Sequence, residues 1–391
     1  MFTDLPNTWQ TVEFGSVLDG GTRTGIYKKQ EFRGSGMKMV NMGELFAYPR
    51  LKDVPMSRIQ LNDAETERYS LQVGDLIFAR RSLVAEGAGK CSIIYEFKEP
   101  LTFESSIIRA RPKPDVANSL FLFYLFNSPI GRYLLDTILR QVAVAGITGS
   151  DLVKLNIPLP PLSEQRAIAG ILGALDDKIE LNRRMNRTLE SMARAVFQEM
   201  MRDESGRMKA GTVGEDFNLT MGQSPPGETY NEGGEGVPFF QGRADFGFRY
   251  PENRVYCTAP TRFAKSGDTL VSVRAPVGDV NMAKEECAIG RGVAAVRHKT
   301  GSRSYTYYAM KSLEEDFGRF EAEGTVFGSI NKADFQNLEI GIPTTEQVEQ
   351  FEKTCYPMDQ MIENNEKESR TLASLRDSLL PKLMRGEVRV K

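Results

Sequence analysis

Basic, amide and aromatic side chains gather in glycine-rich stretches of the sequence, and such side chains contact nucleic acids. Arginine bonds phosphates and guanine edges, and glutamine pairs with adenine. One group lies in "GGTRTGIYKK" and "ARRSLVAEGAGK", and another in "GQSPPGETYNEGGEG", "FFQGRADFGFRYPENR" and "VRAPVG". Each residue alone is also explained as a solvated loop residue. The candidate DNA-binding residues are Arg23, Lys28, Lys29, Arg80, Arg81, Lys90, Ser224, Tyr230, Gln241, Arg243, Arg249, Arg274 and Arg291.

Catalytic and metal-binding patterns are absent from the sequence. It has no N-P-P-[FY] or D-P-P-[FY] motif of an amino-methyltransferase, no P-loop and no cluster of metal ligands. The single histidine, His298, stands among charged residues in "VRHKT", which predicts a solvated loop residue and not a general base. The four cysteines stand singly, which predicts free thiols. We therefore expect a protein that catalyses no reaction and holds no metal or cofactor itself.

Short strands are predicted where a Gly-Asp turn precedes an apolar, β-branched run. "VGDLIFAR" and "SGDTLVSVR" match one another, and they deliver Arg80 and Arg274 at the strand ends. "ESSIIRARP" and "AIGRGVAAVRH" then repeat the idea of a strand carrying arginines. The pattern predicts two small mixed α/β domains, residues 1–155 and 208–342, with twisted, mainly antiparallel sheets. Their long Gly/Pro-rich loops are the expected working surfaces.

One long stretch of the sequence occurs twice. A shift of 183 residues aligns Asp176 with Asp359 and Asn182 with Asn365. It gives ten identities in the 27 positions from Asp176 to Arg202, where ordinary composition gives roughly two. The sequence therefore contains an internal repeat, with one copy after each predicted domain.

Each copy is predicted to form a long helix. In the first copy Pro161 precedes the helix, Ser163 is the expected N-cap, and the helix runs to about Asp203, which is about 60 Å at the α-helical rise. A rod of this length holds two domains apart. In the second copy Pro357 is expected to loosen the start of the helix and Pro381 its end.

Apolar and polar residues recur at alternating steps of four and three along both copies, which is the pattern of a coiled coil. Both seams become polar at the same level, and a polar layer fixes register and orientation. We therefore predict that the two helices pair antiparallel; the alternative is that each packs separately on its own domain. The seam residues are Ile168, Leu172, Leu175, Ile179, Asn182, Asn186, Leu189, Val196, Met358, Ile362, Asn365, Ser369, Leu372 and Leu379.

Size, hydropathy and charge define the class of protein. The 391 residues exceed what one hydrophobic core organises and predict two or more domains. No apolar run has membrane-span length, and the start "MFTDLPNTWQ" lacks the features of a signal peptide, so the sequence predicts a cytoplasmic protein. The net charge of −2 and pI of about 5.9 argue against a nucleic-acid partner. Local basic loops answer this objection if partner proteins share the neutralisation of phosphates.

Over its whole length the sequence resembles the specificity subunit of type I restriction-modification systems. The resemblance rests on "LNIPLPPLSEQRAIAGILGALDDKIELNRR", "GQSPPGETYNEGGEGVPFFQG", "GDTLVSVRAPVG" and "AIGRGVAAVRH"; the second copy departs from it with "IPTTEQ" for "LPPLSEQ". It implies an α+β fold and a pseudo-two-fold internal repeat. The implied parts are target-recognition domains at 1–155 and 208–342 and helical spacers at 156–207 and 343–391.

The resemblance also implies a function and partners. Such a subunit reads a bipartite, asymmetric site on double-stranded DNA. One copy in each complex holds two methyltransferase subunits and two restriction and translocation subunits, so S-adenosylmethionine and ATP belong to the partners. Two other classes stay open: a non-DNA scaffold with two interaction domains on a coiled coil, and a stand-alone methyltransferase or nuclease, which the missing motifs disfavour.

Overall fold

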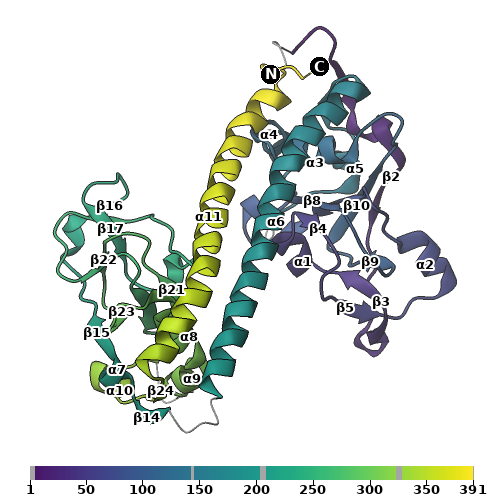
Figure 1. Cartoon of the computed structure of the whole chain (residues 1–391). Helices are drawn as coiled ribbons and strands as arrows, with labels where there is room; N and C mark the ends of the chain where they lie inside the picture. The colour runs from purple at the N-terminus through teal and green to yellow at the C-terminus, as the bar shows by residue number, and fades with distance from the viewer. Residues whose placement is uncertain (1–4, 142–144, 203–207, 323–327, 391) are drawn as a thin grey trace. The chain divides into compact units, whose positions relative to one another are not determined.

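The computed structural model of the chain describes residues 5–141, 145–202, 208–322 and 328–390. The chain forms two compact units, the first comprising Met1–Ile179 and Thr371–Lys391 and the second comprising Glu180–Arg370. Each unit contains one mixed α/β domain and a segment of each of two long helices, α6 (Leu162–Met201) and α11 (Thr345–Met384) (Figure 1).

Among the described residues, the first domain contains a five-stranded main sheet, two three-stranded sheets and one two-stranded sheet. Its helices are α1 (Met42–Ala47), α2 (Asp63–Tyr69), α3 (Ser119–Asn127), α4 (Pro129–Thr137) and α5 (Gly149–Leu152). Its strands are β1 (Gln10–Glu13), β2 (Leu18–Thr24), β3 (Arg33–Val40), β4 (Arg50–Leu51), β5 (Ser57–Ile59), β6 (Leu76–Ala79), β7 (Arg81–Ser82), β8 (Cys91–Ile94), β9 (Leu101–Phe103), β10 (Ile107–Pro112), β11 (Arg140–Gln141), β12 (Ala145–Gly146) and β13 (Asn156–Leu159). The main sheet has the order β2-β10-β6-β8-β4, the second sheet has the order β5-β3-β9, and α3 packs against β8.

The second domain has a similar plan. Its helices are α7 (Val213–Asp216), α8 (Arg303–Ser312), α9 (Glu314–Ala322) and α10 (Lys332–Gln336). Its strands are β14 (Lys209–Thr212), β15 (Phe217–Met221), β16 (Tyr230–Asn231), β17 (Val237–Phe240), β18 (Tyr256–Cys257), β19 (Phe263–Ala264), β20 (Thr269–Val273), β21 (Val277–Met282), β22 (Cys287–Ile289), β23 (Val293–His298) and β24 (Glu339–Ile342). The main sheet has the order β15-β23-β20-β21, the second sheet has the order β16-β18-β17-β22-β19, and α8 packs on the main sheet.

The main sheets of the two domains share four strands in the same order. The runs β2-β10-β6-β8 and β15-β23-β20-β21 have the same order, and every neighbouring pair in them is antiparallel. Each second sheet contains one parallel pair, β3 with β9 and β17 with β22. The predicted pair of similar mixed α/β domains with mainly antiparallel sheets is therefore confirmed.

The repeated Gly-Asp turns explain part of this match. Gly74 and Gly267 have φ angles of 91° and 82°, which favour glycine. Asp75 accepts a hydrogen bond from Arg111 Nε at 2.7 Å, and this bond raises the pKa of the guanidinium. Arg297 binds Asp268 in the same way. The arginines predicted on β10 and β23 thus hold the turns that precede β6 and β20.

The long helices begin and end differently from the sequence prediction. The Pro161 carbonyl accepts hydrogen bonds from the amides of Glu164 and Gln165, so Ser163 lies inside the first turn of α6 and is not its N-cap. Helix α11 runs unbroken through Pro357 and Pro381, so the expected loosening at these residues is wrong. Each proline removes one backbone bond from a helix of 40 residues, and tertiary packing supplies most helical stability.

The two "EQ" starts use different contacts. Gln165 is fully buried, and its side chain bonds the Asn118 amide and the Pro160 carbonyl, each at 2.8 Å. In the second copy Thr344 and Gln347 bond one another's backbone amides as a capping box at the start of α11. The second copy, with "IPTTEQ", therefore has a local capping box where the first copy has a buried glutamine that bonds the domain.

The helix segments pair antiparallel within each unit. In the first unit Asp176 of α6 binds Arg376 of α11 at 2.6 Å. In the second unit Asn365 donates to Asn186 at 2.8 Å, and Asn182 donates to Ser369 at 3.2 Å. The predicted seam residues are all buried or half-buried. Beside them, Phe197 is 3% exposed and packs against the ring of Phe351. Neither phenylalanine was among the predicted seam residues.

The polar layer gives the first testable prediction. Asn365→Ala leaves the Asn186 amide buried without its partner, which costs about 1 to 3 kcal/mol of unfolding free energy. Replacing Asn186 and Asn365 together by Leu removes both polar groups and restores stability. Urea denaturation of the full chain measures both effects, and a double variant no more stable than Asn365→Ala would contradict the role of the layer.

Candidate nucleic-acid interface

Three loops of the second domain meet at the ends of β17, β20 and β23. Gln241 follows β17, Arg274 follows β20, and Arg291 precedes β23. The Val273 amide donates to the Gly292 carbonyl at 2.9 Å. A Cβ added to Gly292 would lie 2.2 Å from the Gln241 carbonyl oxygen, so glycine permits this close approach. The structure thus brings these loops together.

Ser224 and Arg243 extend the same group. The Ser224 hydroxyl accepts a hydrogen bond from the Arg291 amide at 3.3 Å, and Arg243 forms an ion pair with Asp279 at 2.7 Å. This pair is exposed and contributes little stability, so Arg243 can exchange it for a phosphate. The side chains of Gln241, Arg274 and Arg291 are exposed and make no hydrogen bond or ion pair within the described residues. The second basic cluster is Ser224, Gln241, Arg243, Arg274 and Arg291.

Two predicted contacts of the second domain have structural roles. The Tyr230 hydroxyl donates to the Pro225 carbonyl at 2.7 Å, and its ring lies 4.7 Å from that of Phe239. Arg249 is fully buried and binds Asp359 at 2.5 Å and the Tyr308 hydroxyl at 3.0 Å. The expectation that Arg249 contacts DNA is corrected, because its guanidinium is inaccessible to solvent.

In the first domain, the loop from Arg80 to Lys90 joins β6 to β8 and contains β7. The Ala79 amide donates to the Lys90 carbonyl at 2.9 Å, and Lys90 Nζ donates to the Phe46 carbonyl at 3.0 Å. Arg80 is half-buried, whereas Arg81 is exposed and unpaired among the described residues. Residues 80–90 are the first basic loop.

Arg23, Lys28 and Lys29 form a separate group. Arg23 donates to the Arg68 carbonyl at 3.0 Å, Lys28 pairs with Glu65 at 2.7 Å, and Lys29 is exposed. These contacts involve β2 and α2 and none of the first basic loop. The predicted cations of the first domain therefore lie in two groups.

Three residues of the first domain were not among the predicted contacts. Arg109 lies opposite Arg23 in the pairing of β10 with β2, and burial and then Arg111 lower the pKa of its guanidinium. Leu83 and Val84, at the tip of the first basic loop, are 94% and 60% exposed. Apolar side chains contact thymine methyl groups and wedge between bases. Two apolar residues in a loop that also contains arginine and lysine were therefore the sequence signal for these candidates.

His298 and the cysteines are buried. The His298 ring bonds Asp216 at 3.0 Å and Thr300 at 2.7 Å, so the expectation of a solvated histidine is wrong. All four cysteines are free and buried. Among the described residues no cluster of His, Cys, Asp or Glu fits a metal ion, and no described helix is long and apolar enough to cross a membrane.

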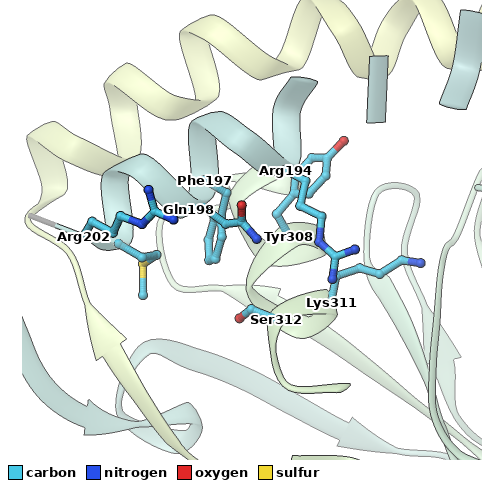
Figure 2. A pocket seen from close by; sticks show the side chains of 8 residues that line it. Arg194, Phe197, Gln198, Arg202, Tyr308, Lys311 and Ser312 are labelled. Carbon is cyan, nitrogen blue, oxygen red and sulfur yellow. The ribbon is translucent and has the colours of Figure 1, made fainter. Parts of the chain in front are cut away.

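A pocket of about 420 Å³ lies between α6 and α8 in the second unit (Figure 2). Figure 2 shows Arg194, Phe197 and Gln198 of α6 facing Tyr308 and Lys311 of α8. The lining offers cations, aromatic rings and the Ser312 hydroxyl, and it contains no carboxylate.

Comparison with known proteins gives a consistent result. The family model described as "Type I restriction modification DNA specificity domain" matches residues 6–191 and 212–372. A Methanocaldococcus jannaschii protein with the provisional name type I restriction enzyme MjaX specificity subunit is 29% identical over 99% of this chain and 95% of its own length. The type I restriction enzyme MjaIX specificity subunit of that organism is 23% identical over the same shares. In fold, the chain resembles the crystal structure of a type I restriction-modification system S subunit from M. genitalium, with a TM-score of 0.63 and 17% identity over 97% of this chain and 96% of that one.

The contrast between two arginines is testable. Arg249→Ala leaves Asp359 buried without its ion-pair partner and costs about 3 to 5 kcal/mol of unfolding free energy. Arg274→Ala removes an exposed side chain and changes stability by less than about 0.5 kcal/mol. Chemical denaturation compares the two variants, and similar small losses would refute the assignment of Arg249 to the fold.

Proposed function

The chain belongs to the type I restriction modification DNA specificity family, and on that premise we propose that it reads a bipartite, asymmetric DNA site, one half-site for each of its two domains. It is thus a DNA-recognition component of a restriction-modification complex. The non-DNA scaffold is not supported by the family match.

One observation carries the proposal: two domains share a strand plan while their loops differ. The first basic loop spans residues 80–90, whereas the corresponding turn between β20 and β21 spans only residues 274–276. Shared strands provide the same frame, and different loop side chains read different bases. Two domains of this kind in one chain fit a site with two unlike halves.

The charge distribution supports recognition within a complex. The net charge of −2 provides no general attraction for DNA, yet Arg81, Arg274 and Arg291 are exposed in the loops. Phosphate contacts supply most non-specific affinity. We therefore expect partner subunits to supply many phosphate contacts while this chain supplies base contacts.

We propose two methyltransferase partners, each docked on one copy of the repeat. Arg187, Thr188 and Ser191 are exposed on α6 and are identical to Arg370, Thr371 and Ser374, which are exposed on α11. Packing within the chain does not require identity at exposed positions. A common partner that binds both copies would account for this identity. Exposed Met192 and its counterpart Leu375 add apolar area to the two surfaces.

The chemistry then resides in the partners. We propose that the methyltransferases bind S-adenosylmethionine, that two restriction and translocation subunits use ATP, and that one copy of this chain, without a cofactor or metal, directs them in the cytoplasm.

The first functional prediction tests this division of labour. The purified chain transfers no methyl group from S-adenosylmethionine to duplex DNA. With its cognate methyltransferase it forms a complex that binds one sequence tightly and loses affinity steeply as salt rises. Radiolabelled methyl transfer and binding titrations measure this, and methylation by the chain alone would overturn the proposal.

A second prediction separates the half-sites. Arg243→Ala with Arg274→Ala relaxes reading of one half-site, whereas Arg80→Ala with Arg81→Ala relaxes the other, by about 1 to 3 kcal/mol for each lost base contact. Methylation of duplexes with single base changes in each half measures the loss. Arg319→Ala, an exposed change on α9, is the control and leaves both halves unchanged. Equal losses at both halves would mean that these arginines bind only phosphate.

A third prediction concerns stoichiometry. Arg187→Glu places a negative charge on one docking surface only, and Arg370→Glu does so on the other. Each variant retains one methyltransferase of the two, and the double variant retains neither, as measured by native mass spectrometry. Lys353→Glu, at an exposed position where the two copies differ, keeps both partners. Two bound methyltransferases in the double variant would exclude these surfaces.

A further inference from the structure

The repeat places an aspartate at the same position of both helices, and each aspartate binds groups from its own domain. In the second unit Asp359 of α11 accepts from Arg249 at 2.5 Å and from the Tyr308 hydroxyl at 3.3 Å. The Arg249 guanidinium also lies 3.8 Å from the centre of the Tyr307 ring. Asp359, Tyr308 and Arg249 are the second anchor.

The first unit contains the corresponding group. Asp176 of α6 accepts from the Tyr124 hydroxyl at 2.6 Å, and Arg50 lies 3.9 Å from the same carboxylate while it binds the neighbouring Asp177. The Arg50 guanidinium lies 4.1 Å from the centre of the Tyr95 ring. Asp176, Tyr124 and Arg50 are the first anchor.

The anchors come from equivalent parts of the two domains. Tyr124 is the sixth residue of α3, and Tyr308 is the sixth residue of α8. The segment with Arg50 lies beside β8, where the Ile93 amide donates to the Pro49 carbonyl at 2.9 Å. The segment with Arg249 lies beside β21, where the Met282 amide donates to the Arg249 carbonyl at 2.8 Å. When the two domains are compared, Pro49 corresponds to Arg249, and Arg50 therefore lies one residue after the position of Arg249.

Stability alone does not account for these anchors. Burying a charge pair costs desolvation energy that an apolar pair of similar size avoids. The Nε atoms of Arg50 and Arg249 are buried and have no hydrogen-bond partner among the described residues. Hydrogen bonds and ring stacking are directional, however, so such a group fixes an orientation that apolar packing leaves less defined.

Each anchor is connected to predicted base-reading residues. Arg249 lies six residues after Arg243, and a single turn of 3-10 helix (Arg243–Asp245) begins the intervening segment. In the first unit Arg50 follows α1, whose Phe46 carbonyl binds Lys90 of the first basic loop. An anchored arginine therefore restrains the segment that presents the recognition loop of its own unit.

We propose that the two anchors are positioning devices, each holding the recognition loops of its own unit in the orientation that reads one half-site. Arg50 acts for the first half-site and Arg249 for the second. The inference rests on the proposed function and adds the residues that direct the loops without touching DNA.

The test uses the full chain with its cognate methyltransferase. Arg249→Met, Tyr308→Phe and Asp359→Leu together replace the second anchor with apolar groups, and this triple variant unfolds at the urea concentration of the parent or higher. Its preference for the cognate base over single-base changes falls about tenfold in the second half-site and is unchanged in the first. Arg50→Met, which leaves Asp176 paired with Arg376, gives the opposite pattern.

Ile340→Ala is the matched control, because it truncates an apolar side chain in the core of the second unit and removes none of the polar groups of the anchor. It lowers the urea midpoint and leaves base preference unchanged, which separates positioning from stability. Asp359→Asn keeps the shape of the anchor but leaves the Arg249 charge without its ion-pair partner, and it supplies the same half-site test if the triple variant does not fold. Full base preference in both second-anchor variants, or equal losses at both half-sites, overturns the inference. A wild-type complex that methylates no bipartite site overturns the proposed function itself.

Discussion

A polar layer between two helical segments fixes the alignment on which the second unit depends. Asn365 bonds Asn186, and Asn182 bonds Ser369, inside an otherwise apolar seam. Sliding either helix by one turn would bury these amides without partners, at about 1 to 3 kcal/mol for each. Because Asp359 lies on the same helix, this alignment also determines where Arg249 and its loop are held. The register of the paired helices and the orientation of the loop are thus linked through α11.

The run D-x-x-I-E-x-N, which both copies contain, acquires a physical meaning for most of its positions. The aspartates are the helix residues of the two anchors, the isoleucines at 179 and 362 are buried in the seam, and the asparagines at 182 and 365 belong to the polar layer. The glutamates at 180 and 363 are half-buried, and the structure gives no account of their identity. Identity that continues on the exposed surface fits a partner that binds both copies.

Local patterns were readable from the sequence, whereas long-range contacts were not. The Gly-Asp turns, the repeat and the seam depend on patterns along the sequence itself, and all appear in the structure. Arg243 and Arg249 lie in the same loop-like stretch, yet Arg249 is buried by a contact with Asp359, 110 residues away. His298 is likewise buried beside Asp216, 82 residues earlier. Pro357 was expected to loosen a helix that packing around Phe351 and Cys355 maintains.

We propose that one chain reads two unlike half-sites with two similar domains. The most direct test of this proposal is a genome-wide map of N6-methyladenine in a host that expresses this chain with its cognate methyltransferase. We expect a single asymmetric motif, with two different half-sites separated by a spacer of fixed length and unspecified sequence. A continuous motif, or a palindrome with identical halves, would contradict the assignment of one half-site to each domain.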